Sequence, residues 1–250
     1  MINHIRQSNP SGRLRRLVFL LVLTLSQSAS AGTGTKKTGK HLFILSGQSN
    51  MTGTVKGAFA ARVEKRFGKE NVVVVIRQKS GRGIRFWVAD YRQPTGRGLT
   101  DKKMSSNGQE YKPLIETALA ASKDNSFETV SFIWMQGESD ANNRLSEVYE
   151  ESFIKLVDQL KKDLGRDDLQ FVIARINDYA RSRPDNDHWH RVRETQVTLG
   201  KTPGNAWIDT DDLNGGDANK PDGDIHFPTE GAVVLGQRFA DKVIELITKK

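Results

Sequence analysis

The sequence predicts an α/β protein in which a five-stranded parallel sheet lies between two layers of helices, a three-layer α/β/α sandwich. Five short apolar runs suited to buried strands recur along the chain, at residues 42–45, 72–76, 130–135, 171–176 and 206–208. Segments with the apolar spacing of helices separate these runs. Strands joined through helices form a parallel sheet covered on both faces, because each right-handed crossover packs its helix back onto the sheet.

The helical spacing is clearest in the second half of the chain. Apolar side chains recur every three or four residues over 145–164 and over 232–246, which places them on one face of a helix. Weaker patterns of the same kind cover 58–67, 113–121 and 190–199. These segments supply the helices that the two outer layers require.

Irregular segments remain at 81–108, 178–187 and 211–224. In a parallel sheet, reactive groups gather in the loops beyond the carboxyl ends of the strands. We therefore expect these loops to form the functional site.

The first 31 residues differ from the rest of the chain. Three arginines within 13–16 precede an apolar run at 17–23, and the segment ends in Ala-Ser-Ala at 29–31. This order is typical of a signal peptide, and the apolar run is far shorter than the ~20 residues of a membrane-spanning helix. We predict a signal peptide at 1–31, a secreted or periplasmic protein, and no stable membrane association after cleavage; an uncleaved anchor is the alternative.

Folding is expected to begin at His41. Residues 32–40 are rich in glycine, threonine and lysine, a composition with too little apolar surface to order the chain, so we predict a flexible tether there. The remaining segment, 41–250, suits one domain. The chain has no cysteine, so it neither needs nor is harmed by an oxidising compartment.

The charge of the chain argues against a polyanionic partner. The sequence has 38 basic and 30 acidic residues, but four arginines belong to the predicted signal peptide, which leaves 34 basic residues. Acidic and basic residues alternate along this remainder, apart from a loose basic cluster at 77–85. We therefore do not expect nucleic acid as a partner.

A candidate nucleophile follows directly on the first predicted strand. The segment 47–51 reads Gly-Gln-Ser-Asn-Met, and its Ser49 lies where backbone N–H groups and a helix dipole can face an oxyanion. An ordinary helix cap is the alternative, because serine and asparagine are favoured caps.

His226 is a candidate general base, since histidine accepts a proton near neutral pH. It lies in a loop that runs into the last helix, with Asp222 and Asp224 beside it, so one loop offers a base and an acid to orient it. In the alternative interpretation, the two aspartates only form a turn and His226 packs near the cap of that helix.

Three blocks together carry a resemblance to a known superfamily. They are the segment 47–51, the segment Trp-Met-Gln-Gly-Glu-Ser-Asp at 134–140, and Asp-Ile-His-Phe at 224–227 with the helix that follows. They resemble the SGNH (GDSL-like) hydrolases, and within them the sialate O-acetylesterase-like and carbohydrate acetylesterase branch. The resemblance implies a flavodoxin-like fold, an acyl-enzyme route without metal or cofactor, and acetylated carbohydrate as the substrate.

The same resemblance implies roles for individual residues. Ser49 attacks the ester, His226 relays the proton, and the oxyanion is bound by the Ser49 backbone, Gly81 and Gln136, with Gly83 as an alternative to Gly81. These relatives usually carry the orienting acid three residues before the histidine, where this chain has a glycine. Asp224, Asp222 and Glu138 are therefore the candidate acids.

Other residues allow weaker interpretations. His188 and His190 point ~200° apart on a helix and are not expected to share a metal ion. Trp189, Trp87 and Arg85 either line a sugar-binding rim or pack within the fold. Two rival functions also remain, a non-catalytic carbohydrate-binding protein of the same fold and a lipase or thioesterase.

Overall fold

The computed structural model describes residues 39–96, 99–100, 104–179, 186–215 and 223–249. A five-stranded sheet with the order β2-β1-β3-β4-β5 runs through this part of the chain, and every neighbouring pair of strands is parallel. The strands are β1 (Lys40–Gly47), β2 (Val72–Gln78), β3 (Phe127–Met135), β4 (Gln170–Ala174) and β5 (Ala206–Ile208). The predicted five-stranded parallel sheet is confirmed.

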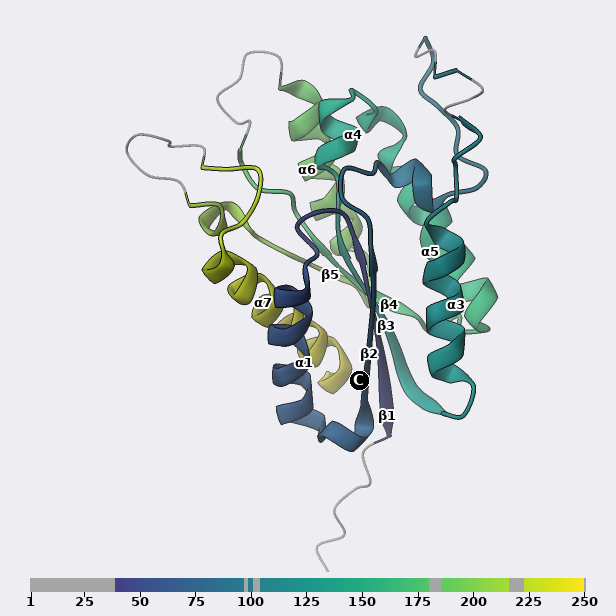
Figure 1. Cartoon of the computed structure of the whole chain (residues 1–250), viewed down its shortest axis with the longest axis vertical. Coiled ribbons are helices and arrows are strands. Elements are labelled where there is room, and N and C mark those ends of the chain that lie inside the picture. Colours follow the sequence, from purple (N-terminus) through teal and green to yellow (C-terminus); the bar gives the residue numbers. More distant parts are fainter. Residues whose placement is uncertain (1–38, 97–98, 101–103, 180–185, 216–222, 250) are drawn as a thin grey trace, which may run out of the picture. The chain divides into compact units, whose positions relative to one another are not determined.

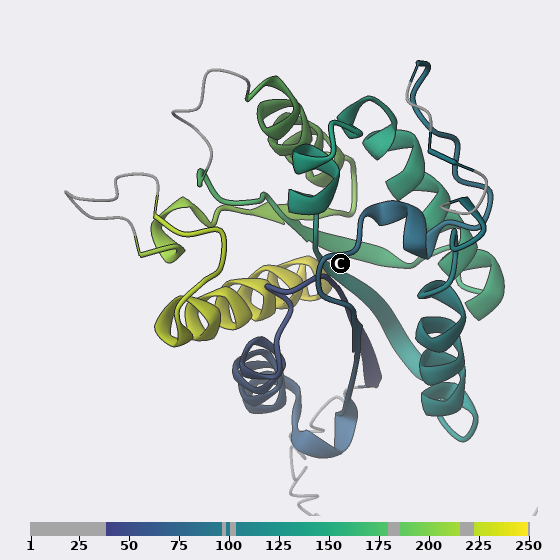
Figure 2. The ribbon, with the colours of Figure 1, turned by 45° about the horizontal axis from the view of Figure 1, so that its top comes forward.

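Helices cover both faces of the sheet (Figure 1). α1 (Gly53–Phe67) and α7 (Thr229–Thr248) pack against each other on one face. α3 (Tyr111–Ser122), α5 (Tyr149–Leu164) and α6 (Asp187–Gly200) lie on the other face. Figure 2 brings the loops at the carboxyl ends of the strands toward the viewer. The three layers are those that the sequence predicts.

Some boundaries differ from the predicted ones. α1 begins at Gly53 rather than at 58, because the Thr52 hydroxyl caps it by accepting a hydrogen bond from the Val55 amide at 3.3 Å. The predicted helix over 145–164 divides into a 3₁₀ turn and α5. The short turns, which the sequence did not predict, are α4 (Glu138–Asn142) and the 3₁₀ turns Lys69–Asn71, Ile84–Trp87, Ser146–Val148 and Asp211–Leu213. Such turns are too short to repeat an apolar spacing.

The start of the folded chain also shifts slightly. Lys40, which the sequence assigns to the tether, is the first residue of β1, and the amide of Gly39 donates to the Glu128 carboxylate at 2.9 Å. The predicted signal peptide at 1–31 and the tether up to residue 38 lie outside the described residues.

The two tryptophans with open interpretations are both buried. Trp87 is 1% exposed and meets Trp134 edge to face, with ring centroids 5.2 Å apart. Trp189 is 2% exposed, and its Nε1 donates to the Asn177 carbonyl at 2.7 Å. Arg85 donates to Ser106 and Asn107 across its own loop. The tryptophans therefore pack within the fold rather than forming a sugar-binding rim.

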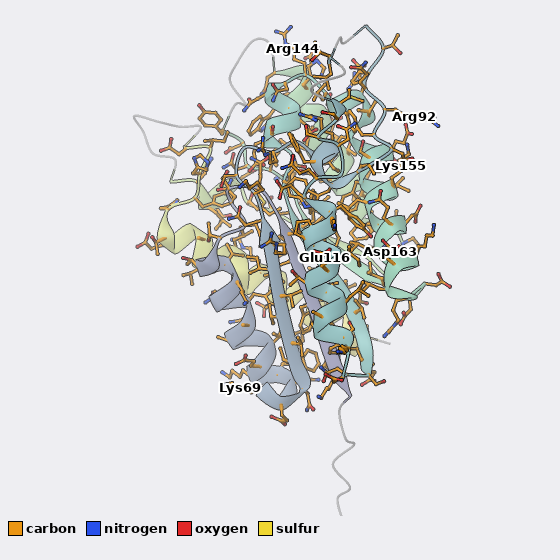
Figure 3. The ribbon with its side chains drawn as sticks, turned by 45° about the vertical axis from the view of Figure 1, so that its right-hand side comes forward. Lys69, Arg92, Glu116, Arg144, Lys155 and Asp163 are labelled. Carbon is orange, nitrogen blue, oxygen red and sulfur yellow. The ribbon has the colours of Figure 1, made fainter. Side chains whose placement is uncertain are left out.

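Charged side chains of both signs point outward around α3 and α5, as Glu116, Lys155 and Asp163 show in Figure 3. Lys155 pairs with Glu151 at 3.0 Å and with Asp90 at 3.2 Å. Exposed pairs of this kind add only ~0–1 kcal/mol to stability, but they divide the surface charge. Among the helices of the described residues, none has both the length and the apolar composition needed to cross a bilayer.

The short helix α4 carries two carboxylates into the interior. Glu138 is 1% exposed and Asp140 is fully buried. One oxygen of each, Glu138 Oε2 and Asp140 Oδ1, has no hydrogen-bond partner among the described residues. Burial raises the pKa of the Glu138 carboxyl to about 7 and that of Asp140 to about 6. The fold therefore holds two carboxylates whose charged form is disfavoured.

These pKa values predict how stability depends on pH. The native state keeps protons on Glu138 and Asp140 that an unfolded chain releases near pH 4.5 and 3.8. Their contribution to the free energy of unfolding is therefore present below those values and is lost as the pH rises toward 7. Glu138→Gln removes one of these groups. The thermal midpoint of the variant minus that of the wild type should increase as the pH is raised from about 5 to about 8. A difference that does not change with pH would contradict the raised pKa.

A second stability prediction concerns the contact of α1 with α7. A Cβ on Gly236 would lie 2.4 Å from the Val55 carbonyl oxygen and 2.9 Å from the Ala58 Cβ. Gly236→Ala should therefore lower the free energy of unfolding, measured in urea, by about 1–3 kcal/mol. Gly57→Ala is the matched control, because a Cβ there meets nothing within 4 Å. It should raise stability by about 0.5–1 kcal/mol, and equal effects of the two changes would refute the steric argument.

Candidate active site

The chain turns sharply where β1 ends. Gly47 has φ of 145°, and a Cβ there would lie only 1.9 Å from the Met135 carbonyl oxygen of β3. That carbonyl accepts a hydrogen bond from the Gln48 amide at 3.0 Å. Only glycine permits this approach, so residue 47 directs the following residues over the carboxyl end of β3.

Ser49 and His226 meet beyond this edge of the sheet. The Ser49 Oγ lies 2.9 Å from the His226 Nε2, although the two residues are 177 positions apart. The serine is half-buried and the histidine is exposed. A hydroxyl within hydrogen-bonding distance of an accessible imidazole has the geometry of a nucleophile and its general base.

Asn50 joins the two loops that carry this pair. Its Nδ2 donates to the Ile225 carbonyl at 2.9 Å, and its Oδ1 accepts from the Phe227 amide at 3.2 Å. These backbone groups lie on either side of His226. The sequence patterns predict no role for Asn50, although this residue stands next to the candidate nucleophile.

Glu138 also contacts the side chain of Asn50. Its Oε1 accepts a second hydrogen bond from the Asn50 Nδ2 at 2.7 Å. The carboxylate that the sequence analysis named as a candidate acid for His226 therefore faces Asn50.

The loop after β2 lies beside the turn at residues 47–49. The Lys79 amide donates to the Gly47 carbonyl at 3.0 Å. Gly81 is exposed, with φ of 68° and open space around it. Gly83 is buried, and a Cβ there would lie 3.2 Å from Asp140 Oδ1. Of the two glycines that the sequence analysis considered, Gly81 therefore has the accessible backbone.

Gln136 is fully buried between the loops after β1 and β2. Its Nε2 lies 3.2 Å from both the Gln48 Oε1 and the Arg82 carbonyl, and it also contacts the Asp140 carboxylate. An amide nitrogen has two protons, so these three protein acceptors already exceed its donors. Gln136 thus holds the loops together and is not brought to an open surface.

Asp140 completes this support by accepting a hydrogen bond from the Ile84 amide at 2.8 Å. It therefore fixes the loop of Gly81 and Gly83, whereas Glu138, on the same short helix, contacts Asn50.

The loop before His226 departs from the usual pattern of the third block, in which an acid stands three residues before the histidine. Gly223, at the position where the related hydrolases usually carry the acid, has φ of 62°. A Cβ there would lie 2.4 Å from the Asn214 side chain, so a larger residue would need a strained backbone and a shift of that side chain. Asp224 is exposed, its amide donates to the Asn214 carbonyl at 2.9 Å, and its carbonyl accepts from Asn177 at 3.0 Å. Asp222 lies outside the described residues.

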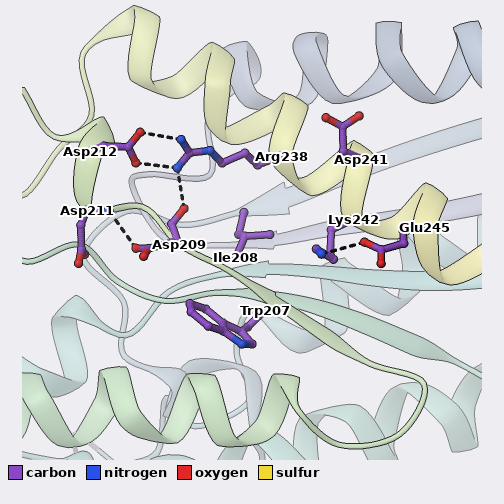
Figure 4. A pocket seen from close by; sticks show the side chains of 9 residues that line it. All are labelled: Trp207, Ile208, Asp209, Asp211, Asp212, Arg238, Asp241, Lys242 and Glu245. Carbon is purple, nitrogen blue, oxygen red and sulfur yellow. Dashed lines mark hydrogen bonds and ion pairs between the residues drawn. The ribbon is translucent and has the colours of Figure 1, made fainter.

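A separate cavity of about 700 Å³ lies between β5 and α7, with Trp207 on its wall (Figure 4). Its charged groups are paired, either with one another or, as Asp241 is with Arg62, with a residue outside the lining. Arg238 binds the Asp212 carboxylate at 2.6 and 2.7 Å, and Lys242 binds Glu245 at 2.8 Å. The lining residues include no serine or histidine, so we place the candidate site at Ser49 rather than in this cavity.

The two histidines at the start of α6 do not converge. His188 Nδ1 lies 2.7 Å from the Ser146 hydroxyl, whereas His190 is exposed and 3.5 Å from the Asn186 side chain. Within the described residues, no group of three histidine, aspartate or glutamate side chains is arranged to hold a metal ion.

Solved structures with a similar fold include three with TM-scores above 0.5. The first is a protein from Arabidopsis thaliana, with 18% identity over 83% of this chain and 98% of that chain and a TM-score of 0.61. A carbohydrate acetylesterase from Xanthomonas citri matches 85% of this chain and 57% of its own, at 18% identity and 0.58. A carbohydrate acetylesterase from Sinorhizobium meliloti matches 83% and 99%, at 17% identity and 0.53. At these identities the likeness concerns the fold.

Comparison of sequences identifies the family. No curated protein sequence matches the chain. The family model described as "carbohydrate esterase, sialic acid-specific acetylesterase" matches residues 55–245, a stretch that contains Glu138 and His226 and begins shortly after Ser49. This match confirms the resemblance found in the three sequence blocks. The chain therefore belongs to the carbohydrate esterase family of sialic acid-specific acetylesterases, which are carboxylic ester hydrolases.

Proposed function

We propose that the protein is an exported serine esterase that removes acetyl groups from carbohydrates, with Ser49 as nucleophile and His226 as general base. The observation that carries the proposal is the 2.9 Å contact between the Ser49 Oγ and the His226 Nε2. This contact is the one that acyl transfer by a serine hydroxyl requires, because the neutral hydroxyl becomes reactive only when a base takes its proton.

The reaction then follows two steps. In the first, the Ser49 Oγ bonds to the ester carbonyl carbon while its proton passes to the His226 Nε2. The tetrahedral intermediate expels the sugar oxygen, which takes that proton, and acetyl-Ser49 remains. In the second step, water gives a proton to His226 and attacks the acetyl-enzyme. Acetate leaves, and the proton returns to the Ser49 Oγ.

Backbone amides supply the proposed oxyanion hole. The Ser49 amide is the first donor, and no described residue accepts a hydrogen bond from it. The Gly81 amide is the second, because Gly81 is exposed and its loop is bound to Gly47. Gln136 contributes by holding these two loops together. Donors fixed in this way need no reorganisation as negative charge develops on the carbonyl oxygen.

Asp224 is the proposed orienting acid. It stands two residues before His226, and its backbone is fixed on both sides by Asn214 and Asn177. The position where the relatives usually carry the acid is Gly223 here, so in this proposal a neighbouring residue takes the role. Orientation by a carboxylate selects the imidazole tautomer whose Nε2 can accept the serine proton.

The description of the matched family supports acetylated carbohydrate as the substrate. Export rests on the arginines, apolar run and small residues of 13–31. We propose that cleavage after Ala31 releases a secreted or periplasmic enzyme.

The proposal predicts a loss of esterase activity on removal of either member of the pair. Ser49→Ala and His226→Ala should lower the kcat for p-nitrophenyl acetate by about 10⁴-fold or more while the chain stays folded. Acetate release from acetylated polysaccharides and acetylated sialic acids, with Ser49→Ala as control, then identifies the substrate. Hydrolysis that survives Ser49→Ala would refute the mechanism, and a preference for long acyl chains would favour a lipase.

A further prediction concerns the acid. Asp224→Ala should reduce kcat by about 10³- to 10⁴-fold with little change in KM, because the imidazole loses its orientation. Asp222→Ala is the matched control from the same loop and should cause a much smaller loss. If the loss at Asp222 is the larger one, the acid is Asp222 and the proposed role of Asp224 is wrong.

A further inference from the structure

Glu138 is a buried carboxylate whose ionisation opposes folding. Its side chain is 1% exposed, and burial raises the pKa of its carboxyl. A buried carboxylate without a bound cation destabilises a protein, and an amide or apolar side chain of the same size avoids this cost. The presence of glutamate at this position therefore requires an explanation other than stability.

The contacts of Glu138 suggest the explanation. The Asn50 side chain forms three hydrogen bonds, to Glu138 Oε1 at 2.7 Å, to the Ile225 carbonyl at 2.9 Å and from the Phe227 amide at 3.2 Å. The last two bracket His226, while Asn50 itself follows Ser49 in the chain. One amide thus connects the nucleophile loop to the loop of the base.

This connection depends on the orientation of the amide. At pH values above its raised pKa the Glu138 carboxylate is ionised and only accepts hydrogen bonds, so it then accepts from the Asn50 Nδ2 and repels the Oδ1. If the amide were rotated by half a turn, the Phe227 N–H would face another donor and lose its acceptor. Glu138 therefore selects the one orientation in which Asn50 holds both sides of His226.

We propose that Glu138 is a positioning residue for the esterase reaction: through Asn50 it fixes the His226 loop against Ser49. This inference rests on the proposed function of Ser49 and His226 and assigns Glu138 a role other than that of the triad acid. A displacement of about 1 Å between reacting groups lowers turnover by about 100-fold, so a hydrogen bond remote from the substrate can control the rate.

Variants of both residues test the proposal through the kinetics of p-nitrophenyl acetate hydrolysis. Glu138→Met, which keeps the size of the side chain and removes the acceptor, should lower kcat by about 100-fold with little change in KM. Glu138→Gln retains an acceptor but adds a donor that also permits the rotated Asn50 amide, so it should recover only part of this loss. Asn50→Ala should match Glu138→Met, and the double variant should be no worse than either, because both changes break one connection.

Amide exchange provides a readout that does not depend on activity. The Phe227 N–H should be protected in the wild type and should exchange faster in Glu138→Met. Asp140→Asn is the matched control, since Asp140 contacts the Ile84 loop instead of Asn50, and it should leave this protection unchanged.

The outcomes separate the two claims. Losses that multiply in the double variant, or unchanged exchange at Phe227 in a folded Glu138→Met protein, would overturn the positioning role. Absence of Ser49-dependent hydrolysis in the wild type would instead overturn the proposed function, and the exchange of Phe227 would still decide whether Glu138 holds the loop.

Discussion

The close approach of β1 to the end of β3 governs the geometry of the site. At Gly47 the backbone lies so near the Met135 carbonyl that any side chain would occupy the position of that oxygen. The Gln48 amide satisfies the same carbonyl, and the chain then crosses over the carboxyl end of β3 instead of continuing along β1. Ser49 and Asn50 owe their positions to this turn, one beside His226 and the other above Glu138.

The short helix α4 has an unusual part in this arrangement. Its two buried carboxylates reach different loops, Glu138 through Asn50 and Asp140 through the Ile84 amide. Both pKa values are raised by burial, so the helix destabilises the fold at neutral pH. Catalytic sites commonly lose stability in exchange for fixed geometry, and in this protein the destabilising groups lie on α4, in contact with the loops of the candidate pair.

The ionic groups near β5 and α7 differ from those of α4, because they are paired with groups of opposite charge. Near β5 and α7, Asp212 and Arg238 form a two-point pair, and Arg193 binds Asp211 through both terminal nitrogens. Each carboxylate there has a cation partner, which stabilises its charged form. The cavity between β5 and α7 is therefore a poor guide to the chemistry of this protein, and the buried carboxylates of α4 are a better one.

The sequence by itself determined the fold, and it singled out Ser49 and His226 as the candidate pair. Apolar runs separated by helical segments predict a covered parallel sheet, and the three blocks around Ser49, Glu138 and His226 carry the family resemblance that the family match confirms. Such patterns are local, because each strand is apolar along its own length and each loop carries its own polar group. Asn50 received no role from them, although it lies within the first block.

Only the tertiary structure decided which of these residues contact one another. The contact of Glu138 with Asn50 and the hydrogen bonds of the buried Gln136 to Gln48 and Arg82 join segments far apart in the chain. Sequence spacing cannot encode them, because a hydrogen bond depends on the direction of a side chain, and that direction is fixed only when the sheet brings separate loops to one edge.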